Sequence, residues 1–213
     1  MTNLKKKITE IREQKKKKNR FNVFIDEKFA FSLSKESVVD SGIKTGDLLT
    51  QAQIDELVFL DQGNRAYNKA LDLLDYRPRS EKEIKDKLKE KNFEGKIIEE
   101  TIKKLLNLNL INDSEFAKMW VEDRKKLKPI GKKVLYLELI KKGIKKEIIE
   151  EFLEKITEED ELKTALNLVK GKRKFQSLPY EEAYKKVGSF LSRRGFPYQT
   201  VKEVIDKLYK KNY

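Results

Sequence analysis

The chain has 213 residues, including 49 Lys or Arg and 36 Asp or Glu, which gives it a formal net charge of +13. It contains no Cys and no His, which excludes disulfides, thiol nucleophiles, zinc–thiolate sites and the commonest general base. No apolar run approaches the roughly 20 residues of a membrane span, and the N-terminus lacks the core of a signal peptide, so we expect a reduced, cytoplasmic setting. The charge points to a polyanionic partner or an acidic protein surface, although an AT-rich genome would also raise the lysine content.

The N-terminal part differs from the rest because it is rich in β-forming residues. Its three short runs are Ile8–Ile11, Phe21–Ile25 and Phe29–Leu33. Asp26-Glu27-Lys28 is a compact hairpin connection, so the pattern predicts a three-stranded antiparallel meander. Alternation places Phe29, Phe31 and Leu33 on one face of the last strand. Such a small sheet needs a packing partner, and we expect this to be residues 37–43 and a following helix.

That helix begins at Thr50, where Thr50-x-x-Gln53 is a capping box, and it can continue past Gly63. We therefore expect an N-terminal unit of a β-meander plus a helix over residues 1–64. Three helical repeats follow, over residues 65–112, 113–157 and 158–213.

The repeats share six apolar positions at fixed spacing around an anchoring leucine. The anchors Leu88, Leu139 and Leu191 lie 51 and 52 residues apart. The three sets are Ile84, Leu88, Phe93, Ile98, Ile102 and Leu105; Leu135, Leu139, Ile144, Ile149, Leu153 and Ile156; and Val187, Leu191, Phe196, Val201, Ile205 and Leu208. This periodicity indicates an internal repeat.

The spacing predicts two amphipathic helices in each copy, joined by a tight turn. Asn92, Gly143 or Gly195 stands where a left-handed residue would end the first helix. A further apolar stretch precedes each pair, near residues 66–74, 116–121 and 162–169. The expected fold is mainly α: three tandem three-helix repeats in an elongated, curved array, preceded by the small sheet.

Several short sequence motifs resemble those of the bacterial RecX family of regulatory proteins. They are residues 74–80 (LDYRPRS), 110–117 (LINDSEFA), 142–144 (KGI) and 190–196 (FLSRRGF), and their order and spacing coincide with the repeat. Residues 8–11 and 20–33 are similar to the N-terminal β extension of longer, Gram-positive-type members. One departure is Asn92, where the other copies have Gly, and Asn tolerates the same backbone region.

The resemblance implies a non-enzymatic modulator of the recombinase RecA in DNA repair, recombination and the SOS response. Family members bind the RecA filament on single-stranded DNA, generally restrain strand exchange and ATP hydrolysis, and can bind DNA directly. The alternative function is a direct DNA-binding protein that has no dedicated protein partner. The expected state is a monomer.

Candidate contacts with RecA or DNA are basic residues in clusters. They are Arg77, Arg79, Arg124, Lys125, Lys126, Lys128, Lys132, Lys133, Lys172, Arg173, Lys174, Arg193 and Arg194. Phosphates would bind such cations with release of counterions. Each cluster also has a structural interpretation: a solvated helix end for residues 124–133, capping of carbonyls for Arg77 and Arg79, and satisfaction of a helix C-terminus for Arg193 and Arg194.

Two aromatic residues near these clusters are expected to be structural. Trp120 shares an apolar face with Phe116 and Val121, and we place it in the core. Phe175, next to the basic loop 170–174, could stack on a base, but burial is the preferred interpretation. Lys15–Arg20 is a basic turn that could touch nucleic acid.

No catalytic site, cofactor site or metal site is predicted. Asp75, Glu83 and Lys85 faintly match a metal-dependent nuclease pattern, but Glu83 and Lys85 would point apart on one helix. The chain also lacks a phosphate-binding loop. The run Glu158–Glu161 is interpreted as a solvated helix N-terminus.

Overall fold

The structure is a computed structural model that describes residues 4–15 and 18–210. It divides into two compact units. The first comprises residues 1–77 and 84–110, and the second comprises residues 78–83 and 111–213.

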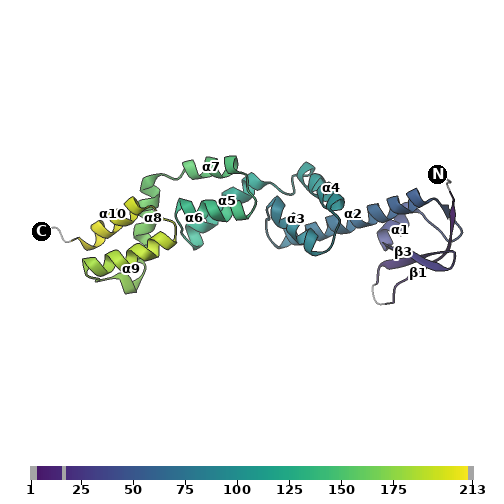
Figure 1. Ribbon diagram of the computed structural model, residues 1–213, viewed down its shortest axis with the longest axis horizontal. Coiled ribbons are helices and arrows are strands. Elements are labelled where there is room, and N and C mark those ends of the chain that lie inside the picture. Colours follow the sequence, from purple (N-terminus) through teal and green to yellow (C-terminus); the bar gives the residue numbers. More distant parts are fainter. Residues whose placement is uncertain (1–3, 16–17, 211–213) are drawn as a thin grey trace. The chain divides into compact units, whose positions relative to one another are not determined.

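The first unit contains the N-terminal antiparallel sheet (Figure 1). Its strands are β1 (Lys6–Glu13), β2 (Arg20–Ile25), β3 (Lys28–Ser34) and β4 (Leu48–Leu49), in the order β3-β2-β1-β4. The predicted meander is confirmed, and its β2–β3 hairpin turns through Asp26 and Glu27, whose φ angles are 49° and 62°. Positive φ at both central residues is what a tight two-residue hairpin requires. The fourth strand was not predicted, because two residues are too few to give an alternating pattern.

The last long strand departs from strict alternation. Phe31 and Leu33 are buried, as predicted, but Phe29 is 59% exposed. The register changes from Val23 opposite Phe31 to Phe24 opposite Phe29, so one residue of β3 has no counterpart on β2. A bulge of one residue reverses the faces beyond it. The prediction that all three apolar side chains share one face was therefore wrong for Phe29, which instead packs edge-on against Phe24 with ring centroids 6.2 Å apart.

Two helices cover the sheet: α1 (Lys35–Ser41) and the long α2 (Gln51–Tyr76). The Thr50–Gln53 capping box forms, and α2 runs through Gly63 without a break, as predicted. The sheet and α2 share a core that includes Ile8, Val23, Leu33 and Ile54.

A buried carboxylate on α2 connects the helix to the sheet. Asp61 is 2% exposed and accepts hydrogen bonds from the Ser34 backbone N–H at 2.6 Å and from the Ser37 hydroxyl at 3.0 Å. Arg20 of β2 approaches the same carboxylate at 3.5 Å. A buried charge is tolerated when it is paired and hydrogen-bonded in this way, so Asp61 fixes the position of the sheet on α2.

The remaining helices follow the predicted order. They are α3 (Glu81–Glu90), α4 (Gly95–Asn107), α5 (Asp113–Leu127), α6 (Lys132–Lys141), α7 (Lys146–Glu154), α8 (Glu158–Lys170), α9 (Tyr180–Arg193) and α10 (Tyr198–Tyr209), with a short 3-10 turn, η1 (Arg173–Phe175), after α8. Among the described residues, the chain is thus mainly helical with one small sheet. Helices α2, α3 and α4 carry the first copy of the apolar pattern, α5 to α7 the second, and α8 to α10 the third.

The three predicted turns have the same hydrogen-bond pattern. Asn92, Gly143 and Gly195 have φ angles of 61°, 83° and 82°. In each turn the next residue donates its N–H to the anchoring leucine carbonyl, at 3.3 Å from Phe93, 3.1 Å from Ile144 and 3.2 Å from Phe196. This is the Schellman motif, in which an apolar residue beyond the left-handed position packs back on the helix. Fifteen of the eighteen patterned residues are buried, and the half-buried ones are Phe93, Leu153 and Leu208.

Within the second unit, a turn of one repeat docks at the start of a helix in the preceding repeat. The backbone N–H of Gly131, just before α6, donates to the Arg194 carbonyl at 2.8 Å. A Cβ at Gly131 would lie 2.3 Å from the Gly195 carbonyl oxygen, so only glycine permits this approach of two backbones. At the equivalent place before α3, the Ser80 hydroxyl donates to the Lys142 carbonyl at 2.6 Å.

Each of these helix starts is also capped by a carboxylate from the next repeat. Asp113 of α5 accepts the Glu81 backbone N–H at 2.9 Å, and Glu161 of α8 accepts the Lys132 backbone N–H at 2.9 Å. Glu161 is only 6% exposed. The interpretation of residues 158–161 as a solvated terminus was therefore wrong for Glu161. This residue lies in the first turn of α8, and its carboxylate caps the start of α6.

Candidate partner-binding surface

The predicted basic residues of the second unit fall into two groups, those held by neighbouring side chains and those exposed to solvent. Arg124 belongs to the first group: its Nε donates to the Glu138 carboxylate at 2.6 Å, and its guanidinium lies 4.6 Å from the Trp120 ring centroid. The same Glu138 oxygen accepts the Trp120 indole N–H at 2.9 Å. Lys142 covers the ring from 4.6 Å and forms an ion pair with Glu83.

Trp120 is thus half-buried rather than fully enclosed. It stacks on Phe116, with ring centroids 5.8 Å apart, and packs against the core of the second repeat, as predicted. Cations beside its ring and a carboxylate at its indole nitrogen satisfy the polar end of the side chain. The tryptophan therefore orients Arg124 and Lys142 on the surface of the unit.

A second aromatic ring organises the basic residues of the third repeat. Arg194 lies 4.8 Å and Lys172 5.6 Å from the Phe190 centroid. The Arg194 guanidinium also donates to the Pro129 carbonyl at 3.0 Å. The Arg194 side chain therefore holds the loop between α5 and α6.

The second group consists of basic residues that are exposed to solvent. Its members are Lys125, Lys126, Lys128, Lys133, Arg173, Lys174 and Arg193. Lys132 is half-buried. Phe175 is 4% exposed, which confirms its burial, and Lys174 lies 5.0 Å from its ring centroid.

Other predicted basic residues lie at the helix corner near α3. Arg77 is the C-cap residue of α2 and is half-buried, and Arg79, also half-buried, precedes Ser80. Both take part in interactions. In the basic turn 15–20, Lys16 and Lys17 lie outside the described residues.

Asp160 and Asp113, two carboxylates of the second unit that cap helices, have shifted pKa values with clear causes. The backbone N–H and hydroxyl of Thr157 hydrogen-bond to Asp160 and lower its pKa, with smaller contributions from Lys125 and Lys163. Burial raises the pKa of Asp113, an effect opposed by its hydrogen bond from the Glu81 N–H. The lowered pKa of Asp160 therefore arises from helix capping, whereas the raised pKa of Asp113 arises from burial.

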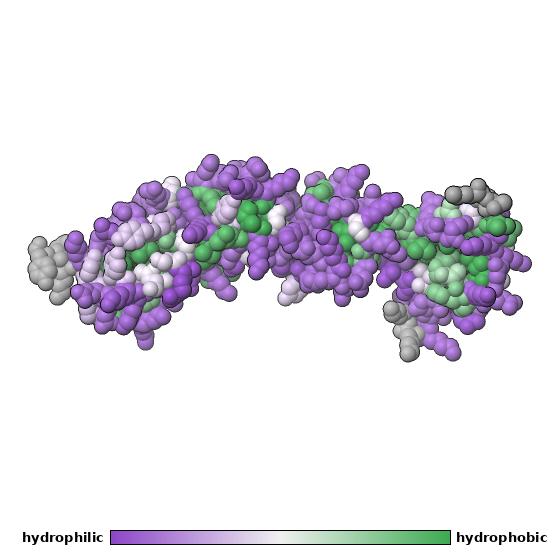
Figure 2. All heavy atoms as spheres, viewed as in Figure 1, coloured by the Kyte–Doolittle hydropathy of each residue, from purple (hydrophilic) through white to green (hydrophobic). Residues whose placement is uncertain are grey.

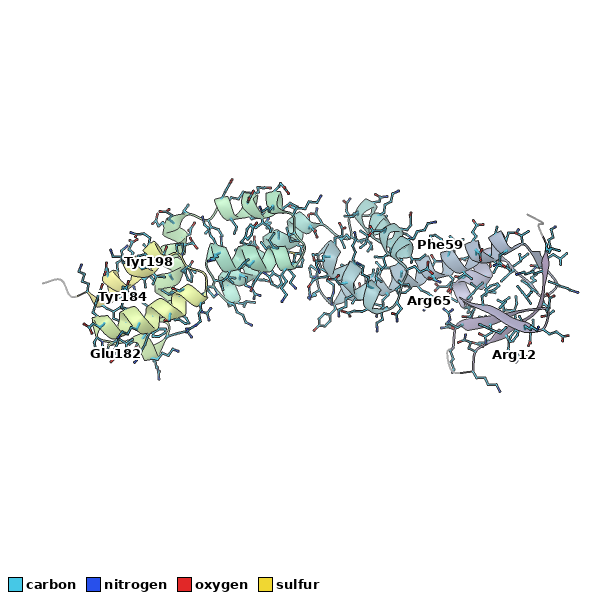
Figure 3. The ribbon with its side chains drawn as sticks, viewed as in Figure 1. Arg12, Phe59, Arg65, Glu182, Tyr184 and Tyr198 are labelled. Atoms are coloured by element: carbon cyan, nitrogen blue, oxygen red, sulfur yellow. The ribbon has the colours of Figure 1, made fainter. Side chains whose placement is uncertain are left out.

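The structure reveals polar surface features that sequence analysis missed. Tyr180, Tyr184 and Tyr198 are exposed on α9 and α10, where the hydroxyls of Tyr184 and Tyr198 lie 3.0 Å apart (Figure 3). This hydrogen bond raises the pKa of Tyr184. Glu138 and Lys142 were missed as well, since only contacts between helices reveal that they meet at Trp120.

Two general features of the surface concern metals and membranes. In the part of the chain that the structure describes, no group of three or more metal-ligating His, Cys, Asp or Glu side chains occurs. None of the helices over the same residues is both long enough and apolar enough to cross a bilayer.

Four family models match the chain in succession. They are the regulatory protein RecX N-terminal domain over residues 6–50 and the first, second and third RecX three-helix domains over residues 66–105, 112–153 and 158–205. They thus divide the chain into one N-terminal part and three helical parts.

Relatives and solved structures agree with these matches. Regulatory protein RecX of Bacillus velezensis is 36% identical over 96% of this chain and 78% of its own length, and that of Clostridium perfringens is 34% identical over 97% and 98%. A crystal structure of regulatory protein RecX superposes with a TM-score of 0.69 at 29% identity, covering 94% of this chain and 99% of that one. A RecX structure from Lactobacillus salivarius covers 70% of this chain and 97% of its own, with a TM-score of 0.63 at 31% identity. The chain therefore belongs to the RecX family of regulatory proteins.

Proposed function

We propose that this chain binds the RecA filament on single-stranded DNA and restrains its strand exchange and ATP hydrolysis. The observation that carries this proposal is membership of the RecX regulatory family across all four matched segments. The protein acts by binding, in DNA repair and recombination, rather than by catalysis.

The exposed basic group supports a polyanionic partner. Lys125, Lys126, Lys128 and Lys133 surround the end of α5 and the loop that follows, and their side chains face solvent. Such cations can approach DNA phosphates or acidic groups of a coated filament without losing a contact of the fold. Arg124, Arg194 and Lys172 instead hold aromatic rings, so we assign them to positioning rather than to direct contact.

The repeated construction supports multiple weak contacts. The three similar repeats lie on one chain, so their contacts with a partner are linked. Once the first contact has formed, the effective concentration of the other repeats at their sites is raised. A filament that presents the same surface at regular intervals offers a matching series of sites.

The test is the DNA-dependent ATPase of RecA at low salt, measured over a range of concentrations of this protein. We expect a progressive decrease in ATP hydrolysis and in strand exchange. The variant Lys126→Glu should require a higher concentration for the same effect, whereas Lys163→Glu on α8 is the control with the same change in net charge. An unchanged ATPase rate, strand exchange and filament length at all concentrations would exclude the proposal.

The second candidate function is direct binding to single-stranded DNA without a protein partner. The exposed cations around α5 favour it, because they suit a phosphate backbone as well as an acidic protein surface. It predicts a steep salt dependence, with a slope of roughly −0.7 per phosphate contacted. Stronger binding to RecA-coated than to bare single-stranded DNA at moderate salt supports the first function, and equal or weaker binding to the coated DNA supports the second.

A further inference from the structure

A groove in the first unit lies between α2 and α4, and none of the basic residues considered above lines it. It has a volume of about 260 Å³ and is lined by Phe59, Leu60, Gly63, Tyr67, Glu100 and Lys104, among others. Figure 2 shows hydrophobic residues reaching the surface over the middle of α2, and Phe59 is labelled there in Figure 3. Leu60 is 55% exposed, so apolar surface remains in contact with water.

The groove is open because of a glycine on α2. Phe59, Gly63 and Tyr67 are four residues apart and therefore share one face of the helix. A Cβ added at Gly63 would meet nothing within 4 Å. The space between the two aromatic side chains can therefore receive a side chain from another molecule.

Charged residues on α4 border this space with alternating signs. Lys96, Glu100 and Lys104 follow one another at intervals of four residues, so that each lies roughly 6 Å along the helix axis from the next. Lys96 lies 4.9 Å from the Phe59 ring centroid, and Lys104 lies 4.0 Å from that of Tyr67. Over the described ranges, neither lysine forms an ion pair, so the two ammonium groups are held at the rings and available to an anion.

This arrangement distinguishes between kinds of occupant. A nucleic acid strand carries negative charge at every phosphate, and Glu100 between the two lysines would repel it. An ammonium group also lies over one face of each ring, where a base would have to displace it in order to stack. A protein segment can place an apolar side chain over Gly63 and acidic side chains beside Lys96 and Lys104, with a backbone N–H or a cation near Glu100.

We propose that the groove between α2 and α4 binds a protein segment that has one apolar anchor flanked by acidic residues. The anchor enters the space above Gly63, where burial of apolar area supplies the attraction. The acidic residues pair with Lys96 and Lys104, which fixes the direction of the segment. In the terms of the proposed function, on which this assignment of the partner rests, the segment belongs to the RecA of the coated filament.

The test uses substitutions at Gly63 that fill the groove without straining α2. Gly63 has no positive φ, and its Cβ position is open, so both Gly63→Ala and Gly63→Leu suit α2. Only the leucine occupies the space of the anchor. Binding of the wild-type chain and both variants is measured on immobilised oligo(dT), bare and coated with RecA, and circular dichroism confirms that the variants are folded.

We expect Gly63→Leu to bind RecA-coated DNA about tenfold more weakly than Gly63→Ala, a change typical of blocking one central contact. Binding to bare oligo(dT) should be the same for both. The double variant Lys96→Gln with Lys104→Gln should show the same selective loss.

The outcomes separate this inference from the function on which it rests. If the wild type prefers coated DNA, and Gly63→Leu has the same affinity for coated DNA as Gly63→Ala, the groove is not the binding site and the proposed function stands. If Gly63→Leu loses affinity for bare oligo(dT) to the same extent, the occupant is nucleic acid and the assignment of a protein segment is overturned. If the wild type itself does not bind coated DNA in preference to bare DNA, the proposed function and this assignment fail together.

Discussion

Substitution of Gly131 by alanine tests the joint between the second and third repeats. The added methyl group would lie 2.3 Å from the Gly195 carbonyl oxygen and 2.7 Å from the Phe196 backbone nitrogen. Both are backbone atoms, which cannot move aside as a flexible side chain can. The two segments would have to separate by roughly 1 Å to reach ordinary contact distances.

The expected cost has two parts. Overpacking of this kind typically destabilises a protein by about 1–3 kcal/mol. The separation also stretches the 2.8 Å hydrogen bond from the Gly131 N–H to the Arg194 carbonyl, and a buried donor left without a partner costs about 1–3 kcal/mol. The same small separation of the two segments relieves the overlap and stretches the hydrogen bond, so the two costs are not fully additive. We therefore expect a loss of about 2–4 kcal/mol in the free energy of unfolding.

Urea unfolding followed by circular dichroism measures this loss, and Gly188→Ala is the matched control. Gly188 lies within α9 of the same unit, and its Cβ would meet only side-chain methyl groups at 3.9 Å. Alanine is favoured over glycine in a helix by about 1 kcal/mol, so this control should be as stable as the wild type or more stable. A Gly131→Ala protein within about 0.5 kcal/mol of the wild type would refute the inferred close approach.

Three further changes probe capping and charge. Asp61→Ala removes the buried acceptor of the Ser34 N–H and should destabilise the sheet on α2 by about 2–4 kcal/mol, as measured by urea unfolding, whereas a loss below about 0.5 kcal/mol would contradict this role. Glu161→Ala should cost about 1–2 kcal/mol because it uncaps α6, and an unchanged thermal midpoint would argue against the cap. The pKa of Asp160 is lowered by its bonds from Thr157, so its stabilising effect is present above the ordinary aspartate pKa and disappears as the pH falls through the lowered value. The difference in thermal midpoint between wild type and Asp160→Asn should accordingly be present at pH 7 and vanish in acid; a difference independent of pH would exclude this linkage.

Periodicity in the sequence predicted most of the helical architecture. The apolar spacing located the helices, and the left-handed positions at Asn92, Gly143 and Gly195 located their turns, because both depend on local geometry that the spacing reflects. Local reasoning failed at Phe29, where a bulge opposite β2 reverses the faces of the strand. A pairing irregularity of this kind is determined by the partner strand and leaves no mark in the strand itself.

The candidate site was less predictable than the fold. The sequence identified the basic clusters, but it could not separate Arg124, which is held by Glu138 and Trp120, from the exposed Lys125 beside it. Neighbouring residues on a helix differ in direction by about 100°, and which direction meets another helix depends on tertiary packing. The groove above Gly63 was missed for the same reason, since an isolated glycine in a helical pattern does not reveal that the space beside it is empty.

The starts of α3 and α6 differ from the start of α9 in their distance from the anchoring leucine. Glu81 and Lys132 each lie seven residues before their anchoring leucine, whereas α9 begins at Tyr180, eleven residues before Leu191. The equivalent position in the third copy, seven residues before Leu191, is Tyr184, which lies inside α9. Its backbone N–H is therefore already hydrogen-bonded within the helix. The third copy therefore lacks, at this position, the free N–H donors with which the starts of α3 and α6 bind groups from the next repeat.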